Sequence, residues 1–288
     1  MLKNFRYFML SFVTALLVWT ILYMFLVYVV HPQTLGTAHT VSTVSTEEPY
    51  SPSAKDAITI LFMGSLQHGD APNAYLLARF DPTAGQVTLA ALPANAAFIN
   101  TGHTESLAEI YNYGGSRYTQ ELIAKTLGIS IDCYVRLTPQ SFLVAMQAIG
   151  SMEYNLPHTL NVLQDGALFE LTQGTQLLDS RKTLQILSYP YQTAEAQTNA
   201  ITDLVAELIL QRRDIALSSM AESVFTTIVN KIDSDISYTD YLNRKEATIY
   251  FALLDTAAVK QITLAGQTEA GLYHLSDTFI AEIRACFG

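Results

Sequence analysis

Residues 109–157 read EIYNYGGSRYTQELIAKTLGISIDCYVRLTPQSFLVAMQAIGSMEYNLP, and the order of the features within them predicts the class of the fold. Asn112–Gly115 is rich in glycine and predicts a turn. Ser116 can then cap a helix that continues through Lys125, because apolar residues recur there at helical spacing. Gly128 tolerates a positive φ and is predicted to end that helix.

The second half of this stretch predicts a strand, a helix and another strand. Residues 131–137 alternate apolar and polar side chains, as a half-buried strand does. Pro139 opens a helix with apolar residues on one face, Gly150 closes it, and residues 152–156 form the next strand. A β-α-β crossover of this kind normally belongs to a parallel or mixed sheet, so we predict an α/β fold.

The order of these motifs resembles that of the LytR-CpsA-Psr family of bacterial envelope proteins. Tyr-x-Tyr-Gly-Gly is followed by a helix, then by Leu-Gly-Ile-x-Ile-Asp-x-Tyr-Val, a second helix, Ile-Gly and a strand that ends in proline. The resemblance is specific over residues 58–211. It implies a three-layer α-β-α sandwich with a central mixed sheet. It also implies an activity, the transfer of a glycopolymer from a polyprenyl pyrophosphate carrier to the cell wall.

The N-terminal region predicts a membrane anchor. Residues 8–30 carry no charge and would span about 34 Å as a helix, against about 30 Å for a bilayer core. Because Lys3 and Arg6 precede this segment, we expect residues 1–6 in the cytoplasm and residues 7–30 as a single-pass signal anchor of the cell membrane.

The remainder of the chain is then expected outside the cell. Residues 31–56 are rich in Thr, Ser and Pro and predict an extracellular linker. Residues 57–288 are predicted to form the extracellular LytR-CpsA-Psr-like domain. Besides the anchor, the domain has several further predicted helices, at residues 180–187, 215–229 and 238–253.

Charge and cysteine content exclude two classes of function. The net charge of the 288 residues is -10 and no Lys/Arg-rich run occurs, which argues against nucleic acid as a partner. Cys133 and Cys286 lie far apart and lack neighbours at zinc-ligand spacing, so we expect two buried thiols.

In the resembled family, acidic residues at the ends of the first strands hold a divalent cation such as Mg²⁺, and arginines bind the pyrophosphate. The chemistry needs them, because a pyrophosphate brings several negative charges that must be neutralised. Here neutral residues stand at most of these places. The pocket positions that match the family motif are Ser65, Leu66, Asn73, Ala94, Asn95, Tyr189 and Tyr191.

Cations are scarce around these positions. Between residues 58 and 104 only Arg79 occurs, at a strand position that we expect to be solvated, and residues 183–211 contain no Lys or Arg. The candidate substitutes are His68, Asp70 and His103. We therefore predict no metal site and no cofactor.

Three hypotheses of function remain open. The first is a catalytically degenerate family member that binds a polyprenyl lipid or regulates cell-envelope assembly proteins. The second is an active phosphotransferase with altered active-site residues. The third is a structural module that binds a protein partner. The missing arginines favour the first over the second, and an open apolar cleft would favour it over the third.

Overall fold

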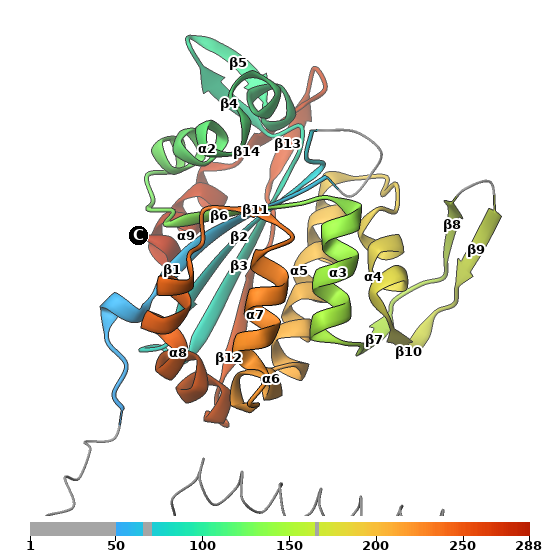
Figure 1. Ribbon diagram of the computed structural model, residues 1–288. Coiled ribbons are helices and arrows are strands. Elements are labelled where there is room, and N and C mark those ends of the chain that lie inside the picture. The colour runs from blue at the N-terminus through green and yellow to red at the C-terminus, as the bar shows by residue number, and fades with distance from the viewer. Residues whose placement is uncertain (1–49, 66–70, 165–166) are drawn as a thin grey trace, which may run out of the picture. The chain divides into compact units, whose positions relative to one another are not determined.

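The computed structural model describes residues 50–65, 71–164 and 167–288, and a six-stranded sheet runs through the middle of this part (Figure 1). The order of its strands is β11-β6-β1-β2-β3-β12. Their bounds are β1 Ile58–Gly64, β2 Ala74–Asp81, β3 Gln86–Pro93, β6 Cys133–Leu137, β11 Asp233–Ser234 and β12 Ala258–Ile262. The β1–β6 and β3–β12 pairs are parallel and the other three pairs are antiparallel, so the sheet is mixed, as predicted.

Both faces of this sheet are buried, which explains why its central strands are apolar at nearly every position. Along β2, Leu76 contributes to the core on one face and Leu77 to the core on the other. A tight turn joins β2 to β3. The Asp81 carboxylate accepts hydrogen bonds from the backbone of Thr83 and Ala84, and Gly85 has a φ of 61°.

Helices cover the two faces and make the fold three-layered. On one face lie α3 (Pro139–Ile149), α4 (Ser180–Leu187), α5 (Ala194–Gln211) and α7 (Ala221–Val229). On the other lie α2 (Leu107–Leu127) and α9 (Asp277–Phe287). α6 (Asp214–Leu217) packs against α8 (Tyr238–Leu253), which adds Phe251 to the first core. The α/β class and the helices on both faces are therefore confirmed.

Four two-stranded ribbons extend from this framework. They are β4 (Ala97–Asn100) with β5 (His103–Ser106), β7 (Met152–Leu156) with β10 (Gly174–Leu178), β8 (Leu160–Gln164) with β9 (Ala167–Leu171), and β13 (Gly266–Glu269) with β14 (Leu272–Leu275). Each ribbon is antiparallel.

The predicted crossover through residues 131–156 is wrong in one respect. β7 follows α3 as expected, but it pairs with β10 and not with the central sheet. Gly150 has a φ of 97° after α3, and β7 buries only alternate residues, as a strand with one solvated face does. The parallel partner of β6 is β1, and α2 lies between the two in the chain.

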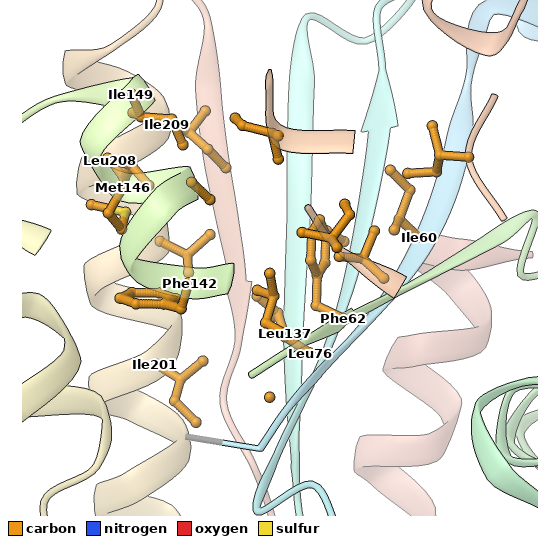
Figure 2. Close-up of a pocket in the computed structure, with 18 of the residues that line it drawn as sticks. Ile60, Phe62, Leu76, Leu137, Phe142, Met146, Ile149, Ile201, Leu208 and Ile209 are labelled. Carbon is orange, nitrogen blue, oxygen red and sulfur yellow. The ribbon is translucent and has the colours of Figure 1, made fainter. Parts of the chain in front are cut away.

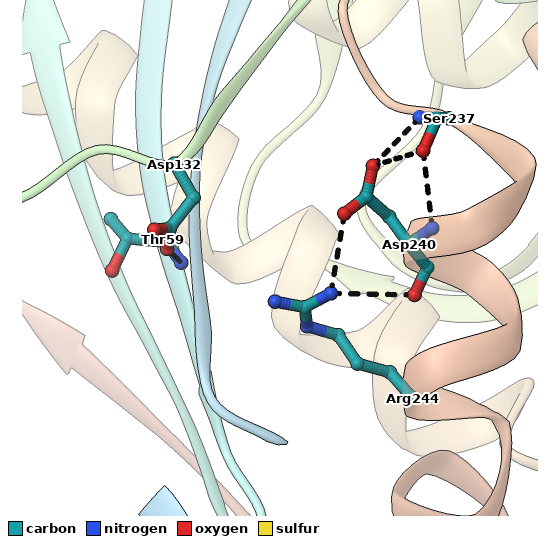
Figure 3. A network of polar contacts seen from close by, with 5 residues as sticks. All are labelled: Thr59, Asp132, Ser237, Asp240 and Arg244. Carbon is teal, nitrogen blue, oxygen red and sulfur yellow. Dashed lines mark hydrogen bonds and ion pairs between the residues drawn. The ribbon is translucent and has the colours of Figure 1, made fainter. Parts of the chain in front are cut away.

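Asp132, from the family-like Ile-Asp motif, fixes this parallel pairing. Its backbone N–H donates to the carbonyl of Thr59 over 2.9 Å, and its carboxylate accepts from the N–H of Thr59 over 2.8 Å (Figure 3). The same view shows the start of α8, where Ser237 and Asp240 cap each other and Arg244 lies 3.4 Å from the Asp240 carboxylate. Asp132 therefore has a structural role at the start of β6.

Two helix boundaries differ from the sequence prediction. α2 begins at Leu107, where Ser106 and Glu109 form a capping box, so a helical segment precedes the predicted turn. The turn itself is present as a break at Gly115, whose φ of 69° and ψ of -165° are not helical, and the helix resumes after it. The helix predicted over residues 215–229 is divided into α6 and α7 at Ser218. The predictions for α4 and α8 are confirmed.

The two cysteines are free, but only Cys133 is buried. Cys286 is partly exposed and its sulfur accepts a 3.1 Å hydrogen bond from Lys260 Nζ, so the expectation of two buried thiols is wrong for Cys286.

The predicted anchor, residues 7–30, lies outside the described residues, as does most of the predicted linker. Among the residues that are described, no helix is long and apolar enough to cross a membrane.

Candidate functional site

An apolar cavity of about 440 Å³ lies between the sheet and the helices α3, α5 and α7 (Figure 2). Side chains of β1, β2 and β6 form its floor, among them Ile60, Phe62, Leu76 and Leu137. Phe142, Met146 and Ile149 of α3 and Ile201, Leu208 and Ile209 of α5 face them in the same view. The residues that line it are apolar or glycine, so the cavity suits an apolar ligand.

The position of α7 leaves this space open. Its apolar side chains Phe225, Ile228 and Val229 line the cavity, yet none of the residues of α7 is buried. The helix therefore covers the sheet without packing closely onto it. An apolar ligand in a cavity of this size would supply packing partners to its lining.

One end of the cavity lies where β1 ends and β2 begins, at Gly64 and Ala74. Two predicted site residues meet there. Ser65 is buried and its N–H donates to the carbonyl of Leu137 over 2.8 Å. The N–H of Asn73 donates to the carbonyl of Gly64 over 2.9 Å, so both are fixed through the backbone.

Gln197, in the first turns of α5, belongs to the same end of the cavity and was missed by the sequence analysis. Its side-chain amide donates to the carbonyl of Asn73 over 3.2 Å. Gln197 lies four residues before Ile201 and therefore on the same face of α5 as the apolar residues that line the cavity. A polar residue in line with the apolar stripe was the signal that could have identified it.

Tyr189 and Tyr191 follow α4, whose last residue, Leu187, lines the cavity. Their rings are 5.1 Å apart and nearly perpendicular. Tyr189 packs against the core that contains the cavity. Burial raises the pKa of Tyr191 further above its usual value of about 10, and its neutral hydroxyl can donate a hydrogen bond.

Ala94 and Asn95 lie at the same end of the sheet as Ala74, because they follow Pro93, which pairs with Ala74. Their contacts, however, are with segments on the face opposite the cavity. Ala94 packs against the core under α2, and its carbonyl accepts from Ala108 N–H over 3.0 Å. The Asn95 side chain donates to the carbonyl of Gly271 over 3.0 Å. Both residues therefore hold neighbouring segments in place.

Of the three proposed substitutes, only His103 is among the described residues, and it is exposed in the β4–β5 ribbon. His68 and Asp70, and the predicted pocket position Leu66, lie outside the described residues. Within residues 50–65, 71–164 and 167–288, no group of three or more His, Cys, Asp or Glu is placed to hold a metal ion. The neutral Asn73, Ala94 and Asn95 offer no carboxylate ligand, so they do not fit the divalent cation that the family resemblance implies.

The cations nearest in sequence to the strands face away from the cavity. Arg79 was expected to be solvated, but it donates to Thr59 Oγ1 over 3.3 Å and to the carbonyl of Phe287, the last residue of α9. That expectation was wrong, since Arg79 links the sheet to α9. The Arg136 guanidinium lies 5.5 Å from the ring centre of Tyr111 in α2, whereas its neighbours Val135 and Leu137 line the cavity.

Comparison with known proteins identifies the family of this chain. Residues 25–283 match the LytR_cpsA_psr family. The chain belongs to this family. The match extends beyond the residues 58–211 on which the resemblance was recognised.

Solved structures share the fold at low sequence identity. A protein of Eubacterium siraeum described as a transcription regulator superposes with a TM-score of 0.76 and 17% identity, covering 88% of this chain and 98% of that one. Bacillus subtilis TagV superposes with a TM-score of 0.70 and 15% identity, covering 82% of this chain and 97% of TagV. TagT bound to LIIa-WTA superposes with a TM-score of 0.63 and 17% identity, covering 81% of this chain and 90% of TagT.

Among curated proteins, an uncharacterized protein of Staphylococcus aureus is 23% identical over 118 residues. That match covers 40% of this chain and only 29% of the length of the relative.

Proposed function

We propose that this protein is a membrane-anchored member of the family that binds a polyprenyl-type lipid in the apolar cavity and does not catalyse pyrophosphate transfer. One observation carries the proposal, namely an open apolar cavity whose described residues, including Gly64 and Ala74 at one end, are all uncharged. The protein would act in envelope assembly by holding the lipid or by presenting it to assembly proteins.

The cavity supports an isoprenoid or similar chain as the ligand. Its volume of about 440 Å³ lies within the range of about 300–1,000 Å³ that is usual for ligand sites. A hydrocarbon chain needs no polar partner there, and burying it contributes roughly 25 cal/mol per Å². TagT, which shares the fold, is bound to LIIa-WTA, a wall teichoic acid precursor, and this supports a polyprenyl-linked ligand class.

The uncharged end of the cavity supports the loss of transfer chemistry. A pyrophosphate must be neutralised by cations or by several preorganised donors, and removing one such donor typically costs about 3–4 kcal/mol of transition-state stabilisation. At the matching positions this chain has Asn73 and Ala94, and residues 183–211 contain no Lys or Arg. The altered active phosphotransferase is disfavoured for the same reason.

The structural module is disfavoured by the cavity itself. A protein that only binds another protein gains nothing from empty apolar volume, because a filled core would be more stable. An apolar ligand that occupies the space would recover the missing contacts of the lining.

Native mass spectrometry of the full-length protein in mild detergent tests the proposal. We expect a co-purifying polyprenyl monophosphate or neutral polyprenyl lipid. Val205→Trp, which places a large ring in the cavity, should abolish this binding, whereas Ala196→Trp, at an exposed position of the same helix, should retain it.

Two results would overturn the proposal. A bound pyrophosphate carrier together with transfer activity would revive the enzyme hypothesis. A wild-type protein that is empty, and that takes up no added polyprenyl phosphate, would remove the lipid-binding function.

A further inference from the structure

A cluster of apolar side chains lies on the surface at the corner where α6 meets α7 and α8. The side chains of Leu217, Met220 and Leu253 are 49%, 64% and 66% exposed. Leu217 ends α6, Met220 directly precedes α7 and Leu253 ends α8. Single exposed leucines are ordinary, but a group of them on one surface marks a contact with a partner or a membrane.

Arg213 makes this corner rigid. Its guanidinium donates to the carbonyl of Leu254 over 2.9 Å and to the carbonyl of Leu210 over 3.3 Å. It therefore joins the C-terminal ends of α8 and α5, where a positive charge is favourable. α6 begins at the next residue and packs against α8, and α7 follows it in the chain (Figure 1).

The described unit also begins beside this corner. Tyr50 is its first residue, and the ring of Tyr50 lies 6.0 Å from the ring of Tyr250, one helical turn before Leu253 in α8. The preceding part of the chain contains the predicted anchor, residues 7–30, and residues 31–49 between anchor and domain. Under the anchoring proposed above, those 19 residues would limit the distance between residue 30 and Tyr50 to about 63 Å, at about 3.3 Å per residue.

From these observations we infer that the corner of Leu217, Met220 and Leu253 contacts the surface of the lipid bilayer. This inference rests on the membrane anchoring proposed above. The net charge of the chain is -10, so attraction to an anionic membrane does not drive the contact, and insertion of apolar side chains does.

The corner also adjoins the cavity. Ile209 lines the cavity near the end of α5, one helical turn before Arg213. This end of the cavity is opposite the end at Gly64 and Ala74, because Gln197 in the first turns of α5 bonds to Asn73, and Ile209 lies about 18 Å further along the helix. A bilayer contact at the corner would place lipid chains next to the apolar lining.

Fluorescence quenching in lipid nanodiscs tests this contact on the full-length protein. In a background with Cys133→Ala and Cys286→Ser, a nitrobenzoxadiazole label is attached at Leu217→Cys, Met220→Cys or Leu253→Cys. The control is Leu177→Cys in β10, which is 62% exposed but lies outside the corner. The nanodiscs contain doxyl-labelled phosphatidylcholine as the quencher.

We expect loss of fluorescence at the three corner positions and none at residue 177. The loss should persist in about 1 M NaCl, where charges are screened beyond about 3 Å. Equal quenching at residues 217 and 177, or quenching abolished by salt, would overturn the inference. Because the Val205→Trp variant should lose bound lipid but keep the quenching, the failure of lipid binding and the failure of the bilayer contact give different results.

Discussion

The side-chain amide of Gln197 donates a 3.2 Å hydrogen bond to the backbone carbonyl of Asn73, 124 residues earlier in the chain. This bond joins the first turns of α5 to the start of β2 at the end of the cavity. In the family, the resemblance implies that charged groups gather here. In this chain a neutral amide binds a backbone carbonyl there.

Restoring the family's charges should create a cation site. With Leu66→Asp, Asn73→Asp and Ala94→Arg together, we expect Mg²⁺ to raise the Tm of the variant and to leave the wild type unchanged. A cation at a hundredfold excess over its Kd stabilises by about 2.7 kcal/mol, and each kcal/mol raises the Tm of a domain of this size by about 2–4 °C. Thermal unfolding with and without Mg²⁺ measures the difference.

The control for this prediction carries Leu66→Asn and Ala94→Gln, which change size and polarity without adding charge. It should show no response to Mg²⁺. If the charged variant also fails to respond, the assignment of residues 66, 73 and 94 to the family's metal and phosphate positions is wrong.

Acid should weaken the link between β14 and α5. The Tyr273 hydroxyl donates to the Glu195 carboxylate over 2.7 Å, and this bond holds the pKa of Glu195 below its usual value. Since the folded pKa lies below the unfolded one, the stabilisation is present above the unfolded value of about 4.3 and is lost as pH falls through the folded value. Tyr273→Phe should therefore lower the free energy of unfolding by about 1 kcal/mol at pH 7 and by less below about pH 4.

Urea unfolding of wild type and variant at both pH values measures this difference. Tyr118→Phe is a matched control, because the Tyr118 hydroxyl donates to Asn100, a neutral amide. A destabilisation by Tyr273→Phe that is as large in acid as at pH 7 would contradict the assigned role of the Glu195 charge.

Removing Arg213 should loosen the corner proposed to contact the bilayer. Arg213→Gln loses the bonds to the carbonyls of Leu254 and Leu210, and hydrogen bonds to a charged group are worth about 1.5–3 kcal/mol. We expect a comparable fall in stability on urea unfolding, together with faster hydrogen exchange in α6. Arg117→Gln is the control, because its ion pair with Glu121 is exposed and is worth about 0.5 kcal/mol or less. Equal effects of the two substitutions would show that Arg213 does not hold the corner together.

Local signals in the sequence were sufficient to predict those helix ends at which a proline or a glycine restricts the backbone. Pro139 starts α3, and Gly128 ends α2 with a φ of 70°. What the sequence could not show was which strands pair. β7 alternates apolar and polar residues as expected, yet only the long-range pairing with β10 decides that it stays outside the central sheet.

The candidate site was predicted in part for a related reason. The motif resemblance placed Ser65 and Asn73 at the end of the first strands, where the structure has them. The cavity could not be predicted, because the apolar pattern of Phe225 and Ile228 is the same whether α7 packs tightly or leaves a space. Gln197 was not named as a site residue because its partner is a backbone carbonyl, and the sequence does not show which carbonyl lies opposite a polar residue on a helix face.

Two adjacent leucines of β2 provide the sharpest test of the cavity. Leu77 is 0% exposed in the core under α2, whereas Leu76 is 6% exposed and lines the cavity. Leu77→Ala should lower the free energy of unfolding by about 2–5 kcal/mol, as in a well-packed core. Leu76→Ala should have a clearly smaller effect in the ligand-free protein, because the side chain already faces empty space and has fewer contacts to lose.

Adding a polyprenyl phosphate should reduce the difference in destabilisation between Leu76→Ala and Leu77→Ala. The ligand would supply contacts to Leu76 and none to Leu77, so the destabilisation by Leu76→Ala should increase while that by Leu77→Ala stays the same. Urea unfolding of both variants with and without the lipid measures this. Equal destabilisation by the two substitutions in the absence of lipid would mean that the cavity is closed in solution, and that α7 packs onto the sheet when nothing is bound.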